Sequence, residues 1–305
     1  MNLLITGAAG FIGSALTAHL RAAGHAVTPL DNLSVDSPRQ HPDGLQTRDV
    51  RSLTAQELDD VDTVVHLAAL KSVPASFDVG ALEHNTAVDR HVIHTFAASG
   101  ARRLLLASTC EVYGQQPGPL AETAPYAPRS PYAAGKVTTE HLADVYRPQL
   151  AQGRQIGVLR FFNTFGPDEG ADAVVPAFID AAVQDRPLTI EGDGTQSRDL
   201  TYIGDAISML TRILETPALL PVVNCGSGRA VSVRALADAV IRTAGRGTIT
   251  HAAARINEIQ SFTADMALFN ITYGAIDYLP LDQALAVSLH ERSRAAMSTL
   301  VGGTD

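Results

Sequence analysis

A tyrosine and a lysine stand four residues apart, at Tyr132 and Lys136. Ser130 and Pro131 precede them, and this pair is typical of a helix N-cap followed by the first helical residue. Side chains four positions apart share one face of a helix. A phenol with an ordinary pKa of about 10 becomes a better base beside an ammonium group. The spacing therefore predicts Tyr132 as a general base helped by Lys136, and the alternative is a helical spacing that arose by chance.

A glycine-rich turn follows the first apolar run of the chain. Glycines at such a turn let the backbone approach a pyrophosphate, whose charge the N-terminus of the next helix stabilises. The segment that follows, residues 15–23, has a helical pattern. A plain strand-to-helix turn is the alternative, because a glycine trio alone is weak evidence. The turn reads Gly7-Ala8-Ala9-Gly10-Phe11-Ile12-Gly13.

Two acidic residues end the next expected strands. Asp31 lies eighteen residues beyond Gly13, where a carboxylate accepts hydrogen bonds from ribose hydroxyls and repels a 2′-phosphate. This favours NAD over NADP, and the positive nicotinamide of NAD would further favour ionisation of Tyr132. Asp49 and Val50, at the end of an expected third strand, are candidates for contact with the adenine. A turn role is the alternative for both aspartates.

Short apolar runs alternate with segments long enough for helices, a pattern that predicts an α/β fold with a doubly wound parallel sheet of the Rossmann type. We expect an NAD-binding domain at residues 1–166, with a return segment at about 200–228. A smaller α/β substrate-binding domain is expected at residues 167–199 and 229–305. The proline-rich stretch 115–131 would border the cleft. The runs are 3–5, 26–30, 64–67, 104–107, 157–161 and 222–224.

Composition excludes several classes of function. The net charge of -9 argues against a nucleic-acid partner, which requires a basic face. The two cysteines and ten histidines lack metal-like spacing, so no metal is expected. No apolar run approaches the roughly 20 residues of a membrane span, and the N-terminus does not resemble a signal peptide. We expect a cytoplasmic enzyme that does not bind membranes.

Further motifs occur in a fixed order along most of the chain. Together with the glycine turn and the Tyr132–Lys136 pair, they resemble the extended short-chain dehydrogenases/reductases of the nucleotide-sugar epimerase and dehydratase group. The resemblance implies NAD as the cofactor, a nucleotide sugar as the substrate, and a homodimer formed by the helices after Val79 and Tyr132. The motifs are Asp31-Asn32-Leu33-Ser34, His66-Leu67-Ala68-Ala69, Ser108-Thr109-Cys110-Glu111-Val112-Tyr113-Gly114, Arg160-Phe161-Phe162-Asn163 and Gly192-Asp193-Gly194-Thr195-Gln196-Ser197-Arg198-Asp199.

The resemblance also implies the members of each site. Thr109 would bind the 4-hydroxyl of the sugar, and Asn163, Arg198 and Arg255 would contact the diphosphate. The segment that begins at Arg255, Arg-Ile-Asn-Glu, departs from the family's run of arginine, proline, glycine and acid. The implied cofactor site comprises Gly7, Gly10, Phe11, Ile12, Gly13, Asp31, Asn32, Ser34, Asp49, Val50, Leu67, Ala68, Ala69, Lys71, Asn85, Tyr132 and Lys136. The implied substrate site comprises Lys71, Thr109, Asn163, Val174, Arg198, Arg255 and Glu258.

The triplet Thr109-Cys110-Glu111 bears on the reaction. Oxidation at C4 of the sugar makes the C5 hydrogen acidic, and Glu111 is placed to remove it. Related 4,6-dehydratases carry Thr-Asp-Glu, in which the aspartic acid protonates the leaving hydroxyl. A thiol with a pKa of about 8.5 is protonated at neutral pH, so Cys110 is a candidate for the same role. The alternatives are a buried structural cysteine and a glutamate that makes a structural hydrogen bond.

The Thr-Cys-Glu triplet resembles that of the UDP-N-acetylglucosamine 5,6-dehydratases of tunicamycin biosynthesis. This implies loss of water across C5 and C6 through a transient 4-keto sugar, with NAD regenerated. Delivery of hydride to C6 would instead give a 4,6-dehydratase. A 4-epimerase would use Thr109, Tyr132 and Lys136 without needing Cys110 or Glu111. A UDP-glucuronate decarboxylase and a non-catalytic NAD-binding module are more remote alternatives.

Overall fold

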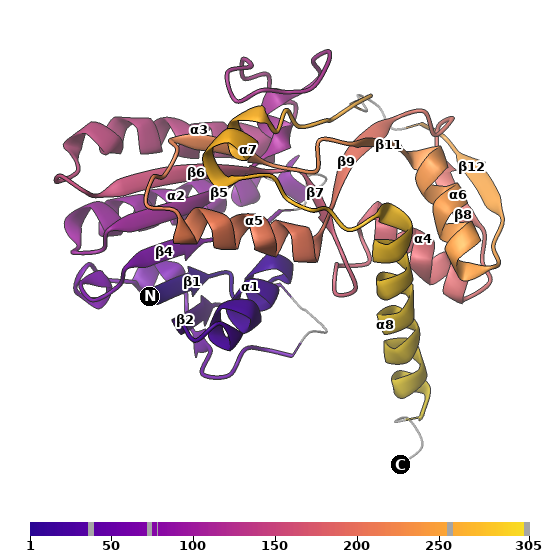
Figure 1. The fold of residues 1–305 in the computed structure, drawn as a ribbon, viewed down its shortest axis with the longest axis horizontal. Helices are drawn as coiled ribbons and strands as arrows, with labels where there is room; N and C mark the ends of the chain where they lie inside the picture. Colours follow the sequence, from indigo (N-terminus) through magenta and orange to yellow (C-terminus); the bar gives the residue numbers. More distant parts are fainter. Residues whose placement is uncertain (36–39, 72–74, 78, 255–258, 302–305) are drawn as a thin grey trace.

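A seven-stranded parallel sheet forms the centre of the molecule (Figure 1). The computed structural model describes residues 1–35, 40–71, 75–77, 79–254 and 259–301. The strand order is β10-β6-β5-β4-β1-β2-β3, and every expected apolar run lies in one of these strands. The predicted doubly wound sheet is confirmed. The strands are β1 Asn2–Thr6, β2 Ala26–Asp31, β3 Gln46–Thr47, β4 Thr63–His66, β5 Arg103–Thr109, β6 Gln155–Phe161 and β10 Val222–Cys225.

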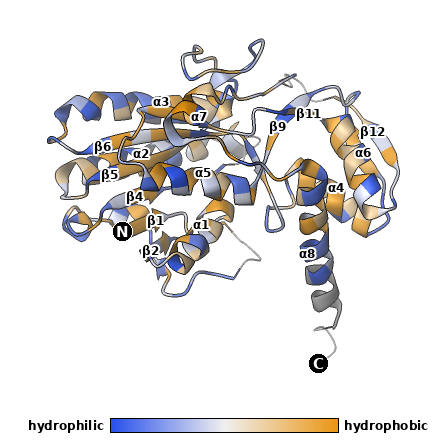
Figure 2. Cartoon of the chain, in the orientation of Figure 1, coloured by the Kyte–Doolittle hydropathy of each residue, from blue (hydrophilic) through white to orange (hydrophobic). Residues whose placement is uncertain are grey.

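Helices cover both faces of this sheet, and alternate side chains of each strand meet different helices. Leu3 and Ile5 pack into the same buried cluster as Leu16 of α1 and Leu210 of α5, whereas Leu4 packs on the opposite face. The second cluster contains side chains of α2 and α3. Apolar colouring follows the central strands in Figure 2. The covering helices are α1 Phe11–Ala22, α5 Ile203–Glu215, α2 Val79–Ala98 and α3 Pro131–Tyr146.

A smaller unit with its own core lies beside the large sheet, on the right in Figure 1. It has a three-stranded sheet, β11-β9-β7, and a two-stranded sheet, β12-β8. Its core includes Phe178, Ile190, Leu236 and Leu285. The strands are β7 Asn163–Phe165, β8 Leu188–Glu191, β9 Ser197–Tyr202, β11 Ala230–Ser232 and β12 Ile249–Ala252. The helices are α4 Val174–Val183, α6 Val233–Ala244 and α8 Leu281–Val301.

A late segment of the chain, around helix α7, packs on the large unit. This differs from the expected assignment of all of 229–305 to the substrate-binding domain. Helix α7, Ala267–Tyr273, contacts α5 and β10. Phe269 and Tyr273 are buried in the cluster that contains Leu210. The physical reason is that β10 forms the edge of the sheet, and these aromatic side chains cover it. Residues 259–276 therefore pack on the large unit.

The third strand is shorter than expected, which corrects the placement of Asp49 and Val50 at a strand end. β3 ends at Thr47, and Asp49 is the N-cap of a 3-10 turn. The Asp49 carboxylate accepts hydrogen bonds from the backbone N–H and the guanidinium of Arg51, which turn the chain away from the sheet. The 3-10 turns are η1 Val50–Ser52, η2 Gln56–Leu58, η3 Ala75–Phe77, η4 Cys110–Tyr113 and η5 Arg147–Gln149.

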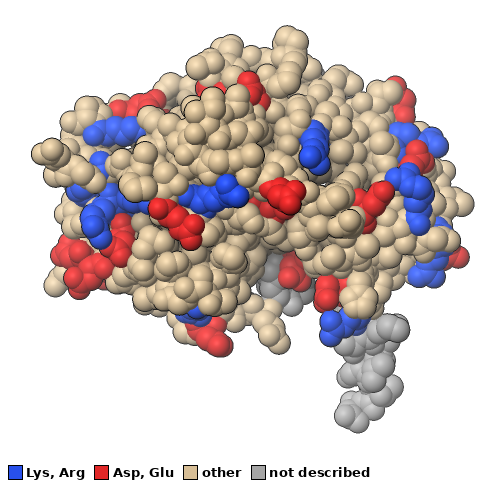
Figure 3. All heavy atoms as spheres, in the orientation of Figure 1, with Lys and Arg blue, Asp and Glu red and all other residues tan. Residues whose placement is uncertain are grey.

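Charge on one face of the molecule and the apolar length of the helices bear on possible partners. On the face drawn in Figure 3, acidic and basic side chains are interspersed. None of the helices, within their described residues, is long and apolar enough to cross a membrane. Among the same residues, no cluster of three or more His, Cys, Asp or Glu side chains could hold a metal ion.

Candidate active site

The predicted helix start is confirmed and positions Tyr132 and Lys136. α3 begins at Pro131, and the hydroxyl of Ser130 accepts a hydrogen bond from the N–H of Ala133 at 3.1 Å. Tyr132 is partly buried, and Lys136 is only 3% exposed. Both residues therefore lie in the first two turns of a capped helix, with the side chain of Tyr132 hydrogen-bonded to that of Thr109 at the end of β5.

The triplet at the end of β5 lies next to Tyr132. Thr109 is 8% exposed and caps η4, because its hydroxyl accepts a hydrogen bond from the N–H of Glu111 at 3.2 Å. Thr109 also shares a hydrogen bond with the side chain of Tyr132, and Cys110 and Glu111 are close enough to influence the pKa of the same phenol. The structure thus brings together four of the five predicted catalytic residues in direct electrostatic contact.

The pKa of Tyr132 is raised well above its ordinary value. Burial is the largest cause, followed by the negative charge of Asp89 and, with a smaller effect, that of Glu111, while the hydrogen bond from Thr109 opposes them. Removal of water and nearby negative charge both disfavour a phenolate. Tyr132 is therefore a phenol at neutral pH in the protein alone, and a base role requires additional positive charge.

Lys136 is paired with a carboxylate that the sequence analysis did not single out. Its Nζ lies 3.1 Å from Oδ2 of Asp89, and both side chains are almost fully buried. His66 is 3.0 Å from the other carboxylate oxygen. The available sequence signals were the position of His66 at a strand end and the spacing of Asp89, which lies one helical turn after Asn85. Neither signal predicts that His66 and Asp89 contact each other.

A buried ion pair fixes the flanks of the catalytic triplet. The guanidinium of Arg160 donates to Glu140 at 2.7 Å and to the hydroxyl of Tyr113 at 2.9 Å. Ser108, directly before Thr109, donates to the same glutamate at 2.5 Å. Removing one member of such a pair leaves an uncompensated buried charge, which is strongly destabilising. The pair therefore holds β5, η4 and α3 in a fixed arrangement.

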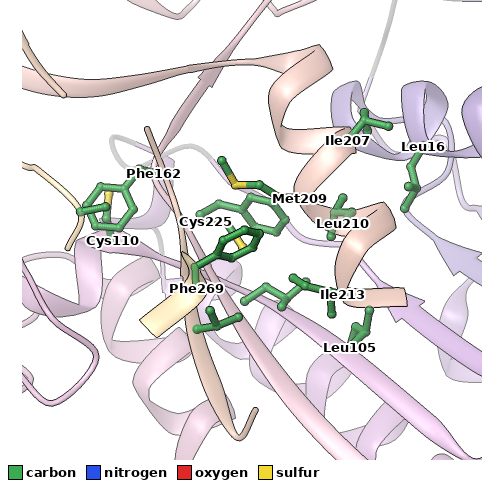
Figure 4. Close-up of a cluster of buried hydrophobic side chains, with 14 of the residues drawn as sticks. Leu16, Leu105, Cys110, Phe162, Ile207, Met209, Leu210, Ile213, Cys225 and Phe269 are labelled. Carbon is green, nitrogen blue, oxygen red and sulfur yellow. The ribbon is translucent and has the colours of Figure 1, made fainter. Parts of the chain in front are cut away.

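Cys110 is largely enclosed by apolar side chains. It is 4% exposed and belongs to the buried cluster that contains Phe162, which lies beside it in Figure 4. Burial, and next the charge of Glu111, raise the pKa of the Cys110 thiol well above its ordinary value. Arg198 acts in the opposite direction. The thiol is therefore protonated at neutral pH, which fits both a structural cysteine and a proton donor.

The glycine turn has the close backbone contacts expected of a phosphate-binding loop. Gly7 has a φ of 71°, and a Cβ atom there would lie 2.7 Å from the N atom of Ala68. A Cβ on Gly13 would lie 2.1 Å from the carbonyl oxygen of Gly7. Within the described structure, no side chain caps the N-terminus of α1 at Gly10. The N-terminus of α1 carries partial positive charge next to these close-packed glycines, so the residues present fit the pyrophosphate of NAD.

The other predicted cofactor residues surround this turn. One oxygen of Asp31 accepts from the N–H of Ala9 at 3.0 Å, and the other accepts from the N–H of Leu33 at 2.9 Å. The side-chain oxygen of Asn32 accepts from the N–H of Ser34 at 3.0 Å. These bonds place Asp31 against the glycine turn at the end of β2.

The segment after β4 is held by a side-chain clamp. Asn85 is buried, and its amide makes two hydrogen bonds of 2.9 Å with the backbone N–H and C=O of Leu70. The clamp fixes the backbone that carries Leu67, Ala68 and Ala69, and Lys71 lies exposed next to it. Asn85 therefore contributes to the predicted cofactor site by positioning this segment.

Besides Thr109 and Lys71 on the large unit, three predicted substrate residues lie on the smaller unit or at the start of β7. Asn163 is exposed at the start of β7, Val174 begins α4, and Arg198 lies on β9. Arg198 donates to the carbonyl of Ile259 at 2.8 Å, and its charge reaches Cys110. Arg198 therefore faces the catalytic triplet. The remaining two candidates, Arg255 and Glu258, lie outside the described residues.

Comparison with known proteins gives consistent matches over most of the chain. A profile of the NAD dependent epimerase/dehydratase family matches residues 3–226. YtcB of Bacillus subtilis strain 168, named as an uncharacterized UDP-glucose epimerase, is 33% identical over 273 residues, which are 82% of this chain and 84% of that protein.

Two solved structures superpose closely. TunA, described as an NAD-dependent NDP-hexosamine 5,6-dehydratase involved in tunicamycin biosynthesis, has a TM-score of 0.89 and 37% identity over 95% of this chain and 97% of its own. The UDP-glucuronic acid 4-epimerase of Bacillus cereus, solved with UDP-glucuronic acid and NAD, has a TM-score of 0.89 and 28% identity. That match covers 97% of this chain and 100% of the epimerase.

Proposed function

Because this chain belongs to the NAD-dependent epimerase/dehydratase family and is an NAD-dependent nucleotide-sugar enzyme, we propose that it is a dehydratase. The proposed reaction removes water across C5 and C6 of UDP-N-acetylglucosamine through a transient 4-keto sugar. The observation that carries the proposal is the position of Thr109, Cys110 and Glu111 at the end of β5, where the side chain of Thr109 hydrogen-bonds that of Tyr132. The similarity to TunA supports the same reaction.

Oxidation at C4 is the first proposed step. Thr109 hydrogen-bonds the 4-hydroxyl, and Tyr132 removes its proton while the C4–H bond breaks. Bound NAD supplies the hydride acceptor and later the hydride donor. Lys136 lies one helical turn after Tyr132 on α3, and its ammonium is paired with Asp89. Because the pKa of Tyr132 is raised in the protein alone, this step requires the charge of the oxidised cofactor.

Elimination is the second proposed step. Glu111 removes the C5 proton of the 4-keto sugar, and Cys110 donates its proton to the C6 hydroxyl, which leaves as water. The pKa of water is about 15.7, so even a thiol with a raised pKa transfers its proton favourably to the departing hydroxide. The proton on Glu111 then restores the thiol. Hydride return to C4 and proton return from Tyr132 to O4 complete a redox-neutral cycle.

The test is to incubate the enzyme and NAD with UDP-N-acetylglucosamine and follow the sugar by mass spectrometry and proton NMR. Loss of one water with new vinyl signals is the expected result. Vinyl-free loss of water would instead identify a 4,6-dehydratase. Unchanged mass with the galacto isomer would contradict dehydration and identify a 4-epimerase, which the burial of Cys110 among apolar side chains favours as the second candidate.

The proposed assembly is a homodimer formed by α2 and α3. These helices pack together on one face of the sheet. Val145 is 57% exposed, and Arg90, His91, His94 and Tyr146 line a hollow of about 540 Å³ on the same pair of helices. Light scattering during size-exclusion chromatography tests this proposal, and a monomeric mass would contradict it.

A further inference from the structure

Four elements of the large unit contribute to one buried polar cluster behind the Tyr132–Lys136 pair. At its centre is Asp89 of α2, which is 1% exposed. Its carboxylate receives Nζ of Lys136 at 3.1 Å, Nε2 of His66 at 3.0 Å and the hydroxyl of Thr139. The other ring nitrogen of His66 lies 2.6 Å from the hydroxyl of Thr6, directly before the glycine turn. The cluster therefore connects the catalytic helix to the cofactor loop.

The charge state of the central carboxylate follows from its neighbours. Burial alone would raise the pKa of Asp89, but the charge of Lys136 and the hydrogen bonds from His66 and Thr139 hold it well below the ordinary range. Asp89 is therefore ionised. An ionised carboxylate only accepts hydrogen bonds, so Nε2 of His66 carries a proton.

Fold stability alone is a weak explanation for this cluster. Taking a carboxylate and an ammonium out of water costs several kcal/mol per ion. Replacing such a pair by well-packed apolar side chains is often neutral or stabilising. The arrangement is better explained by an effect on the neighbouring site.

Tyr132 is the ionisable group on which this cluster acts. Negative charge acts on the phenol from Asp89 on α2 and from Glu111 on η4, and the Thr109 hydrogen bond opposes their effect on its pKa. The one ammonium on the same helix, Lys136, is directed at Asp89. Opposite charges held close together largely cancel at a third group.

We propose that Asp89 is a positioning residue that fixes the ammonium of Lys136 and cancels much of its charge, so that Tyr132 becomes a base only when the oxidised cofactor is bound. The inference rests on the proposed roles of Tyr132 and Lys136. It explains how the site avoids holding a reactive phenolate before the hydride acceptor is in place. His66 and Thr139 act through Asp89 by holding its carboxylate in one orientation.

Nuclear magnetic resonance of tyrosine labelled with ¹³C at Cζ tests this directly, and Tyr132→Phe assigns the signal. In the cofactor-free wild type we expect a phenol at neutral pH. Addition of NAD is expected to lower the midpoint of Tyr132 ionisation by at least about one pH unit. A phenolate at neutral pH without NAD, or no change on adding it, would overturn the proposal. This measurement needs no substitution at Asp89.

Asp89→Asn provides the second measurement, because it removes the charge with little change in shape. The Tyr132 ionisation of the cofactor-free variant is expected to move by at least about one pH unit toward lower pH. Thr139→Val is the matched control, since it removes a hydrogen bond to the same carboxylate and keeps its charge. An unshifted Asp89→Asn variant, or an equal shift in Thr139→Val, would contradict the proposal.

The chain offers an internal reference for the lysine. It contains only two lysines, Lys136 and the exposed Lys71. In ¹⁵N-lysine-labelled protein, Asp89→Asn is expected to shift the Lys136 signal and leave that of Lys71 in place. If the expected shifts of Tyr132 and Lys136 were observed but the enzyme turned over no sugar, the proposed function alone would be contradicted. Normal turnover with an unshifted Tyr132 in Asp89→Asn would contradict this inference alone.

Discussion

In the proposed mechanism, Glu111 is the residue whose role distinguishes dehydration from epimerisation. Its backbone N–H is tied to Thr109, and its charge reaches the phenol of Tyr132. Replacing Glu111 by Gln keeps the shape but removes the base that takes the C5 proton. We therefore expect water loss to fall by at least about 100-fold, the usual lower size of a general-base effect, while C4 oxidation continues. The reduced cofactor detected by absorbance and the product detected by mass spectrometry measure the two steps.

The matched control for this variant is Glu215→Gln, at the exposed end of α5. It makes the same chemical change away from the site and is expected to turn over normally. Normal water loss in Glu111→Gln would contradict the proposed elimination. Loss of C4 oxidation together with water loss would assign Glu111 to the binding of the sugar instead.

The two cysteines form a second matched pair, because both are buried in the same apolar cluster. Only Cys110 adjoins Thr109. Replacement of Cys110 by Ser removes the thiol acid, and elimination is expected to slow by about 100-fold. In Cys225→Ser, elimination is expected at the wild-type rate, while the unfolding free energy falls by about 1 kcal/mol or more because a hydroxyl is buried. Equal elimination rates in both variants would contradict the proton-donor role of Cys110 and indicate that it is a structural residue.

At the level of elements, the junction between β1 and α1 determines cofactor binding. A methyl group on Gly13 would lie 2.1 Å from the carbonyl oxygen of Gly7, so Gly13→Ala must push the helix away from the turn. We expect NAD affinity to fall by at least about tenfold, which is about 1.4 kcal/mol. Isothermal titration calorimetry measures this loss.

Gly24 supplies the control for that change. It follows the same helix with a φ of 84°, and a Cβ there meets no atom within 4 Å. Gly24→Ala is expected to cost about 1 kcal/mol of stability through backbone strain and to leave NAD affinity unchanged. If Gly13→Ala bound NAD as the wild type does, the turn would not be the pyrophosphate site.

The elements that the sequence predicted well are those with strong local signals. Ser130 and Pro131 marked the start of α3 because a hydroxyl cap and a proline each act within one helical turn. The apolar runs marked the strands because a parallel sheet is buried on both faces. The end of the third strand was placed two residues too late. Asp49 instead accepts a hydrogen bond from Arg51 in a local turn, and such a side-chain bond leaves no periodic pattern in the sequence.

At the scale of the whole molecule, contacts between distant segments determine features that local sequence patterns do not predict. Asp89 meets Lys136, 47 residues away, only because α2 and α3 pack side by side. Helix α7 joins the large unit because Phe269 and Tyr273 cover β10, a contact between segments more than 40 residues apart in the chain. The catalytic segments were recognisable from their residues, whereas the buried partners that orient them depend on tertiary contacts between distant segments.

Stability at high pH is a property of the whole chain, because six of its seven tyrosines have a raised pKa. Burial raises the pKa of Tyr126 to about 12, whereas an unfolded tyrosine titrates at about 10. A raised folded pKa contributes stability that is complete below the unfolded pKa and is lost as pH rises through the folded one. With two lysines in the chain, few other groups titrate in this range.

We therefore expect the unfolding free energy to fall steeply from about pH 10 to about pH 12, by about 1.4 kcal/mol per pH unit for each such tyrosine. Urea denaturation followed at a series of pH values measures the slope. Tyr126→Phe removes one titrating group, and Glu140 keeps its bonds to Arg160 and Ser108. In this variant the unfolding free energy should fall less steeply with pH, by the contribution of one tyrosine. A free energy that stays constant across this range would show that the buried phenols reach water without unfolding, and the same would then hold for Tyr132 in the catalytic site.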